Sequence, residues 1–546
     1  MLIWRNPASS RLMKRIPSTL IAILLSLSVA GTAVAQDGHH HAGSVMQVGH
    51  ITFPISCSKR AQEEVEQGLA MFHSFLFEDA EAEFNAAAEA DPACAMAYWA
   101  EAIGLYRPLA YPTSPADMKR GWDLIQKAGK LHPKSQREQD YVHAAEILYR
   151  EDARAYALRN HEYSAELEKI HKTYPDDIEA AVFYALSVLT GADNQQPVAT
   201  AEKTLAILDP IFAAHPDHPG VAHYVIHAAD TPELASRGLA AARHYAQIAP
   251  SAPHALHMPS HIFARLGLWQ EDIQSNLASL HAAQNPALHA GGENQLHAME
   301  FLEYAYLQIG EDEKAEAMVQ MQHKVRYGQV DPNLHSYVNQ TFANSPALFY
   351  LETRNWNGVL ALKPDSGAEI HNQAITFWAQ AVAAGHLHDL SATKKAVDEF
   401  DARFDATSKG PKVHMAKNMP TRRDEAHAWL LLLQGQAREA TDLLRKRADK
   451  QDGEGKGEIE TPAREMLADM LMEMHRTADA LAEYERSMKI DPSRFNALYG
   501  AAHAAELLGN RDKERTYDSQ LLKQCAAGSP RPELDHARQV LRQLGE

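Results

Sequence analysis

The sequence predicts an all-helical protein in which antiparallel helix pairs repeat along the chain and form a curved α-solenoid. Two observations lead to this fold class. The segments 61–92 and 480–500 place small and aromatic residues at matching intervals. The chain also lacks sustained alternation of β-branched residues, and it has no Asn-Gly or Asp-Gly turn flanked by such runs. We therefore expect helical hairpins and no sheet.

The repeat is clearest in the first segment. Gly68, Ala80, Phe84, Ala87 and Pro92 have the offsets of the tetratricopeptide motif, in which two antiparallel helices recur about every 34 residues. Small residues allow the two helices to cross closely, Phe84 should fill the gap to the next hairpin, and Pro92 should end the second helix. The later copy holds Ala480, Tyr484, Ser487, Pro492 and Gly500, and weaker copies occur at Gly267, Gly310 and Gly435.

The N-terminus has the features of a cleaved export signal. A basic start precedes an apolar run over 19–30, and the small-x-small sequence at 33–35 marks a cleavage site. The run is shorter than the roughly 20 apolar residues that a membrane span needs. We expect a mature chain that begins near Gln36, is periplasmic or secreted, and has no transmembrane segment. An uncleaved anchor is the alternative.

Breaks in the helical pattern divide the rest of the chain. The glycine-rich segment 451–461 is the best candidate for a flexible loop or a hinge between lobes. The predicted parts are a signal peptide (1–35), a flexible histidine-containing tail (36–56), an N-terminal lobe (57–200), a histidine-rich middle lobe (201–345) and a C-terminal lobe (346–546).

Composition excludes several function classes. The 546 residues carry 53 basic and 71 acidic side chains, a net charge of −18, and this balance argues against a nucleic-acid partner. The chain has no Gly-x-Ser-x-Gly elbow, no Walker-type loop, no His-Glu-x-x-His and no Cys-x-x-Cys-His. Hydrolases of the common folds, nucleotide-driven enzymes, zincins and c-type haem proteins are therefore disfavoured, and the catalytic residues remain unknown.

The chain has three cysteines, and the predicted export would place them in an oxidising compartment where disulfides form. Cys57 and Cys94 precede successive first helices, and the starts of successive first helices are neighbours in stacked hairpins. A Cys57–Cys94 disulfide and two buried free thiols both fit this placement. Cys525 is unpaired in either case.

Histidine is concentrated in the middle lobe. Two pairs are spaced four residues apart, His223 with His227 and His257 with His261, so each pair presents both imidazoles on one helix face. Of the 30 histidines, eight lie within residues 215–261, namely His215, His218, His223, His227, His244, His254, His257 and His261.

The two pairs predict a transition-metal site. The first pair is expected on a helix that ends before Thr231-Pro232, where the second helix of the hairpin opens, and the other pair on the next first helix, over about 252–265. Pro259 either kinks this helix or begins it. First helices line the concave face of such arrays, and adjacent helices lie about 8–10 Å apart, so the imidazoles can reach one ion. The predicted ligands are His223, His227, His257 and His261, with Asp230, His254 and His297 as additional candidates.

Imidazole ligands suit zinc and copper, which we favour, as well as nickel and iron. Two alternatives stay open. The histidines can be core residues that bond to backbone or carboxylates, or some of them can act in catalysis.

Two segments resemble a group of exported bacterial tetratricopeptide repeat proteins. Residues 91–99 match that group's DP-x-CAMAYW segment, with Ala100 where glycine is usual, and residues 257–262 match its HMPSHI segment. The resemblance covers residues 57–310. It implies the repeat fold and an exported location, and it implies no particular activity.

The sequence thus favours a periplasmic repeat protein that binds a protein, a peptide or a small ligand in its concave groove and carries a histidine-bound metal. One alternative is a metal-dependent enzyme, hydrolytic or oxidative, that uses the same histidines with one coordination position open. The other is a metal-free scaffold that binds peptides or proteins.

Overall fold

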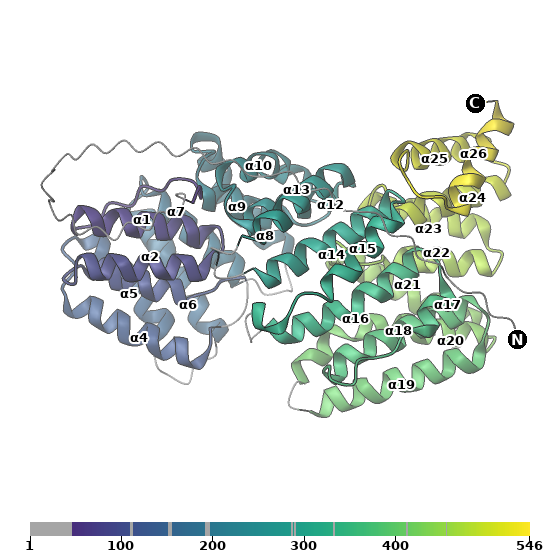
Figure 1. Cartoon of the computed structure of the whole chain (residues 1–546), viewed down its shortest axis with the longest axis horizontal. Coiled ribbons are helices and arrows are strands. Elements are labelled where there is room, and N and C mark those ends of the chain that lie inside the picture. Colours follow the sequence, from purple (N-terminus) through teal and green to yellow (C-terminus); the bar gives the residue numbers. More distant parts are fainter. Residues whose placement is uncertain are drawn as a thin grey trace, which may run out of the picture. The chain divides into compact units, whose positions relative to one another are not determined.

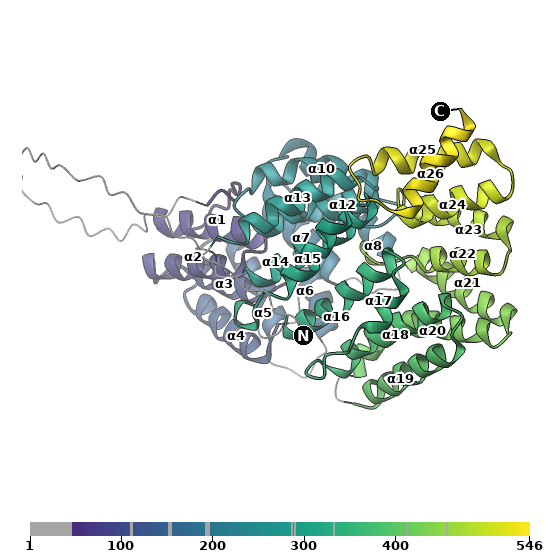
Figure 2. The same cartoon turned by 45° about the vertical axis from the view of Figure 1, so that its right-hand side comes forward.

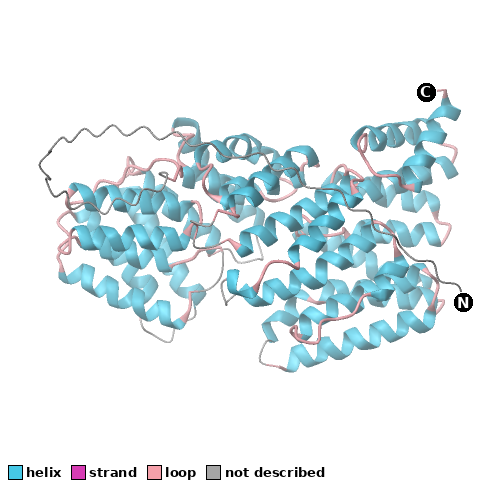
Figure 3. Cartoon of the chain, in the orientation of Figure 1, coloured by secondary structure: helices cyan, strands magenta, loops and turns pink. Residues whose placement is uncertain are grey.

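The computed structural model describes residues 46–109, 113–150, 156–191, 197–285, 288, 291–330, 334–410, 413–454 and 456–545. In these residues the regular structure is helical and no strand occurs (Figures 1 and 3). The predicted all-helical fold of tetratricopeptide-like hairpins is confirmed. The predicted signal peptide and residues 36–45 of the predicted tail lie outside the described residues. None of the described helices is long and apolar enough to cross a bilayer.

The helices pack as hairpins in chain order, and the second helix of each hairpin also contacts the first helix of the next (Figure 2). They are α1 (Lys59–His73), α2 (Phe77–Ala90), α3 (Ala95–Leu105), α4 (Pro115–Lys130), α5 (Gln136–Tyr149), α6 (Tyr156–Thr173), α7 (Ile178–Thr190), α8 (Pro197–Ala214), α9 (Pro219–Ala229), α10 (Ala235–Ile248), α11 (Pro253–His257), α12 (Pro259–Arg265), α13 (Trp269–Ala282), α14 (Gly292–Gln308), α15 (Asp312–Gln322), α16 (His335–Glu352), α17 (Trp356–Ala361), α18 (Ile370–His386), α19 (Leu390–Lys409), α20 (Pro420–Leu433), α21 (Ala437–Glu454), α22 (Ala463–Glu473), α23 (Thr477–Ile490), α24 (Phe495–Leu507), α25 (Arg511–Gln524) and α26 (Pro532–Leu544), with short 3₁₀ helices at Tyr327–Gln329 and Val413–Asn418.

Many hairpins turn through the same three-residue connection. After α1, Ser74 caps the helix, Phe75 adopts a left-handed φ of +56°, and Leu76 precedes α2. Left-handed backbone favours glycine because a Cβ atom is crowded there. The corresponding positions in other hairpins are Gly267, Gly310, Arg354, His388, Gly435, His475 and Gly509. The three weak copies of the motif in the sequence are therefore hairpin turns.

The tetratricopeptide signature works as the spacing predicts. A side chain on Gly68 would overlap the ring of Phe84, and the same ring packs tightly against Gly104 in the next hairpin. Gly500 bears the same relation to the ring of Tyr484. Helix α2 ends at Ala90, just before Pro92. Small residues therefore set how closely neighbouring helices approach, and one aromatic ring fills the space between them.

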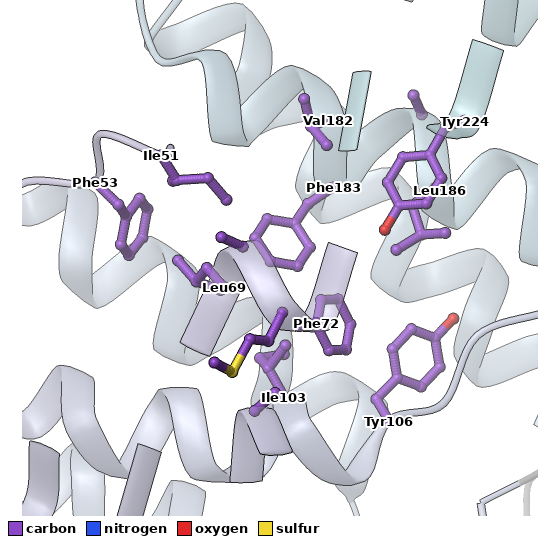
Figure 4. Packing of buried hydrophobic residues seen from close by; sticks show 14 of the residues in the cluster. Ile51, Phe53, Leu69, Phe72, Ile103, Tyr106, Val182, Phe183, Leu186 and Tyr224 are labelled. Carbon is purple, nitrogen blue, oxygen red and sulfur yellow. The ribbon is translucent and has the colours of Figure 1, made fainter. Parts of the chain in front are cut away.

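Apolar packing divides the described chain into several core clusters. The largest runs over residues 48–263 and includes Phe72, Ile103 and Phe183 (Figure 4). The others run over 264–348, 347–505 and 495–534. Packing is thus continuous across residue 200, where the sequence suggested a lobe boundary, and changes cluster near residues 263 and 348.

The segment 46–56 is extended and packs into the largest core. Ile51, Phe53 and Ile55 are buried, and the Phe53 ring stacks on Trp99 with centroids 5.4 Å apart. Ile51 and Phe53 are seen within this core in Figure 4. Within the described part of the predicted tail, residues 46–56 are therefore packed against the core and are not flexible. The segment is held in place because the apolar side chains of Ile51, Phe53 and Ile55 are removed from water.

Cys57 and Cys94 form a disulfide with Cα atoms 5.2 Å apart, while Cys525 is a buried free thiol. The bond joins the entries to α1 and α3, and it closes a loop with a sequence separation of 37 residues. Of the two arrangements that the sequence left open, the structure contains the disulfide.

Replacing both bonded cysteines by serine should lower the free energy of unfolding by about 3 kcal/mol, because the loop no longer restricts the unfolded chain. Urea denaturation with and without a reductant measures the change. The reductant should weaken the wild type by a similar amount and leave the Cys57→Ser/Cys94→Ser variant unaffected. A wild type that is insensitive to reduction would contradict this prediction.

Candidate metal centre

The backbone around the predicted site differs in detail from the prediction. Helix α10 begins at Ala235 rather than at Thr231-Pro232, because Thr231 caps an intervening turn by accepting from the Leu234 N–H at 3.3 Å. The helix predicted over 252–265 is divided into α11 and α12, since Pro259 has no N–H to continue the ladder. Met258, which links them, keeps helical angles (φ −49°, ψ −35°), so the chain direction is nearly maintained.

Six histidines from α9, α11, α12 and α14 form two adjoining groups. In the first trio (His223, His227 and His254) and in the second trio (His257, His261 and His297), the donor nitrogens lie within 4.8 Å of one another. Either trio can therefore supply three nitrogen ligands to a metal ion.

The first trio joins α9 to α11. The Nε2 atoms of His223 and His254 are 3.1 Å apart. His223 donates from Nδ1 to the backbone carbonyl of His73 at 2.6 Å, which leaves its Nε2 lone pair free for an ion. The His227 ring lies 4.7 Å from the His223 ring, and Nε2 of His227 is buried without a hydrogen-bond partner among the described residues.

The second trio joins α11 and α12 to α14. The Nε2 atoms of His257 and His261 are 3.0 Å apart, and the ring of His297 lies 4.3 Å from that of His257. Two nitrogens bound to one tetrahedral ion at about 2.0–2.1 Å are about 3.3 Å apart. The close nitrogen pair in each trio is therefore near the separation that ligands of a shared ion adopt.

Outer hydrogen bonds fix the rings of the second trio. His257 donates from Nδ1 to Oδ1 of Asn276 at 2.7 Å, and Nδ2 of Asn276 donates to Asp272 at 2.7 Å. Tyr337 donates its hydroxyl to Glu300, so its oxygen accepts from Nδ1 of His297 at 3.2 Å.

Carboxylates on two elements hold His261. Its Nδ1 donates to Oδ2 of Asp230 at 3.0 Å and lies 3.3 Å from Oε1 of Glu458. Arg265 binds the same two carboxylates, from Nε at 2.9 Å and from Nη2 at 3.1 Å. Glu458 belongs to the segment predicted as a flexible loop or hinge. In the structure α21 extends to Glu454, and Glu458 contacts the site.

Burial sets the charge of the rings. It holds the pKa of His223, His254 and His257 well below the ordinary value and lowers that of His227 to about 3, so these rings are neutral and able to bind a metal. Burial also lowers the pKa of His261, but Glu458 and Asp230 outweigh it and raise the value to about 10. At neutral pH the raised pKa favours a protonated His261, so an ion bound at its Nε2 would displace a proton.

Aromatic rings cover both trios. Phe75 stacks on His254 with centroids 4.8 Å apart and meets His223 edge-on at 4.5 Å. Phe301 packs against His257 and His261 at 4.8 and 5.0 Å. Phe75 occupies the left-handed turn position, and the turn therefore directs its ring toward the first trio.

The structure groups the predicted ligands differently from the sequence. His223 and His227 belong to the first trio, whereas His257 and His261 belong to the second. The additional candidates His254 and His297 complete the two trios, and Asp230 accepts a hydrogen bond from Nδ1 of His261. A further group at α24 and α26, His503, Glu506 and His536, was not predicted.

Sequence reasoning also missed Asn276, Glu458, Phe75 and Tyr337. Asn276 lies four residues after Asp272, a spacing that signals contact on one helix face. The other three come from distant elements, and no local pattern relates them to the histidines.

No family model and no curated protein matches this chain. Solved structures give distant similarities. The human IFIT1 dimer with m7Gppp-AAAA is 11% identical over 79% of this chain and 90% of that chain, with a TM-score of 0.35. The Cut9–Hcn1 hetero-tetramer of the APC/C is 9% identical over 89% and 90%, and yeast Tom70 is 11% identical over 89% and 96%, each with a TM-score of 0.32.

Proposed function

We propose that this protein is an exported helical-repeat scaffold that holds a transition-metal centre on its histidine trios. The observation that carries the proposal is the convergence of imidazole Nε2 atoms at 3.1 Å in the first trio and 3.0 Å in the second. Outer hydrogen bonds at Nδ1 orient these rings, which is how metal-binding histidines are usually held. All-imidazole ligands favour zinc or copper.

The location is proposed on two grounds. The first is the basic and apolar pattern of residues 1–35. The second is the disulfide between Cys57 and Cys94, since structural disulfides persist in oxidising compartments such as the periplasm.

The variant His223→Ala/His257→Ala, which removes one ligand from each trio, should lose its bound metal. The control His503→Ala/His536→Ala removes two histidines from the α24–α26 group and should retain as much metal as the wild type. Each protein is purified without an affinity tag, incubated with Zn²⁺ or Cu²⁺, passed through a desalting column and analysed for metal by mass spectrometry.

Zn²⁺ should also raise the melting temperature of the wild type and of the control, because an ion that binds the folded state alone stabilises it. It should leave the melting temperature of the His223→Ala/His257→Ala variant unchanged. A wild type that retains no metal and is not stabilised would assign these histidines to the core. Equal metal in the wild type and the trio variant would place the binding elsewhere.

A metal-dependent enzyme is the second candidate, and the ligand count favours it. An ion held by three histidines keeps a fourth coordination position open for water or substrate. His297 is 38% exposed at its side chain, so one ring of the second trio faces solvent. A substrate turned over by the metal-loaded protein and not by the trio variant would support this function.

Binding of a partner is proposed for the surface that the repeats form. The segment 46–56 shows that the array accepts an extended chain. Arg137 donates to the Pro54 carbonyl at 2.9 Å, and the Phe53 N–H donates to Glu66 at 2.8 Å. Side chains of the array can therefore bind a backbone in extended form, as a peptide partner would require.

A further inference from the structure

We propose that the centre holds two metal ions, one on each histidine trio, and that the second trio binds its ion more tightly. This inference rests on the proposed function, because it specifies how many ions the same histidines bind. The ligand class is a zinc-like or copper-like divalent cation that accepts three imidazole nitrogens and keeps a fourth position open.

Ligand number is the first reason for two ions. Six imidazoles converge, but a tetrahedral ion accepts four ligands. The two close nitrogen pairs are separate, since His223 with His254 and His257 with His261 share no atom. A single ion at one pair would leave the other pair without one.

Each trio also has a third ring in position. In the first trio, His227 places a buried Nε2 without a hydrogen-bond partner among the described residues, within 4.8 Å of the other two donor atoms. A buried nitrogen of this kind is costly unless something binds it. In the second trio, His297 takes the same place beside His257.

The trios adjoin one another without merging. The centroids of His254 and His257, which belong to different trios on one short helix, are 6.2 Å apart. Those of His227 and His261, on α9 and α12, are 6.4 Å apart. Helix α11 thus contributes one ring to each trio, His254 toward α9 and His257 toward α14.

The difference in affinity follows from the outer hydrogen bonds. Acidic side chains lie on the outer side of all three rings of the second trio, although burial raises the pKa of one of them, Asp272, well above its ordinary value and favours its neutral form. Asp230 and Glu458 bind His261 directly, Asp272 reaches His257 through Asn276, and Glu300 reaches His297 through Tyr337. In the first trio the outer partner among the described residues is the neutral backbone carbonyl of His73, which accepts from His223. Carboxylate partners make an imidazole a stronger ligand and offset the charge of the ion, and we infer that this gain exceeds the cost of displacing the proton that the same carboxylates hold on His261.

The test counts ions in a full-length chain whose other histidine groups are blocked. The substitutions His39→Ala, His40→Ala, His41→Ala and His503→Ala remove the N-terminal histidine run and the α24–α26 group. In this blocked chain, His254→Asn disables the first trio and His297→Asn disables the second. Asparagine keeps a polar side chain of smaller size at each position, and circular dichroism together with melting temperature verifies folding.

The blocked chain titrated with Zn²⁺ should bind two equivalents, measured by metal analysis after equilibrium dialysis, in two steps of different affinity. His297→Asn should lose the tighter step and His254→Asn the weaker step, so each variant retains one equivalent. One equivalent in the blocked chain, abolished by a substitution in either trio, would overturn the two-ion proposal and leave the proposed metal centre in place. No bound Zn²⁺ would overturn both.

A Cu²⁺ titration gives a readout that does not depend on a variant's stability. Two nearby Cu²⁺ ions should broaden or quench each other's paramagnetic resonance signal as the second equivalent binds. A signal that grows in proportion through two equivalents would show that the ions occupy distant sites, and this would overturn the paired arrangement.

Discussion

Replacing Arg494 by methionine should lower the free energy of unfolding by about 3–5 kcal/mol, as expected when one partner of a buried ion pair is removed. Arg494 is 1% exposed. It donates to Glu352 at 2.7 Å and to Glu465 at 2.8 Å, and it also binds the hydroxyl of Tyr304. Methionine keeps most of the volume, so the loss comes from the two carboxylates that remain buried without their cation.

The control is Arg486→Met. Arg486 is half exposed and pairs with Asp449 at 3.4 Å, so its loss should cost no more than about 1 kcal/mol. Adding Glu352→Gln and Glu465→Gln to Arg494→Met should restore part of the stability, because neutral amides are cheaper to bury than carboxylates. Urea denaturation measures all of these proteins. Equal losses for Arg494→Met and Arg486→Met would contradict the buried-charge interpretation.

Glu179→Gln should lower the free energy of unfolding at pH 7 by about 3–5 kcal/mol, the sum of two hydrogen bonds to a charged group. The buried carboxylate accepts from Nε2 of His73 at 2.9 Å and from Nε2 of His218 at 2.7 Å. A glutamine amide turns an N–H toward one of these donors. The backbone carbonyl of His73 also accepts from Nδ1 of His223, so the segment that Glu179 holds contacts the first trio.

The effect of Glu179→Gln should depend on pH. Burial raises the pKa of the Glu179 carboxyl, but His73 and His218 outweigh burial and hold it well below its ordinary value. A carboxyl with a lowered folded-state pKa stabilises the protein above its unfolded value of about 4.3, and this contribution is lost as the pH falls further.

The difference in melting temperature between the wild type and Glu179→Gln should therefore stay constant from pH 7 to about 4.5 and begin to narrow between about pH 4.3 and pH 3.5. The control is Glu166→Gln, at a partly exposed residue that pairs with the exposed Lys169, and it should change little at any pH. A deficit for Glu179→Gln that is the same at both ends would assign its cause to packing instead of charge.

Much of the fold follows from short-range sequence patterns. The overlap of Gly68 with Phe84 and of Gly500 with Tyr484 is encoded within one hairpin, so the motif offsets are enough to predict it. Ile51, Phe53 and Ile55 alternate with other residues in the sequence, and this alternation is typical of an extended chain with one buried face. The structure buries these three side chains, in the segment predicted as a tail.

The histidine site was only partly predictable. The two i,i+4 pairs lie on neighbouring helices as expected, but the direction of each ring depends on the break between α11 and α12 and on the packing of α14. Glu458 lies 197 residues from His261, and no local pattern signals that contact. Periodicity identifies the faces of helices, whereas contacts between distant elements depend on how the whole array winds.

Such distant contacts bear on how the molecule unfolds. In an ideal repeat array each unit touches only its neighbours, so the ends can fray while the middle stays intact. Here Glu458 binds His261 and Arg265, the Trp269 indole donates to the Ser493 carbonyl at 2.7 Å, and Arg531 binds Asp312. These contacts link units that are far apart in sequence, so we expect the units to unfold cooperatively. Loss of the last hairpins should therefore also lower the stability of the middle of the chain.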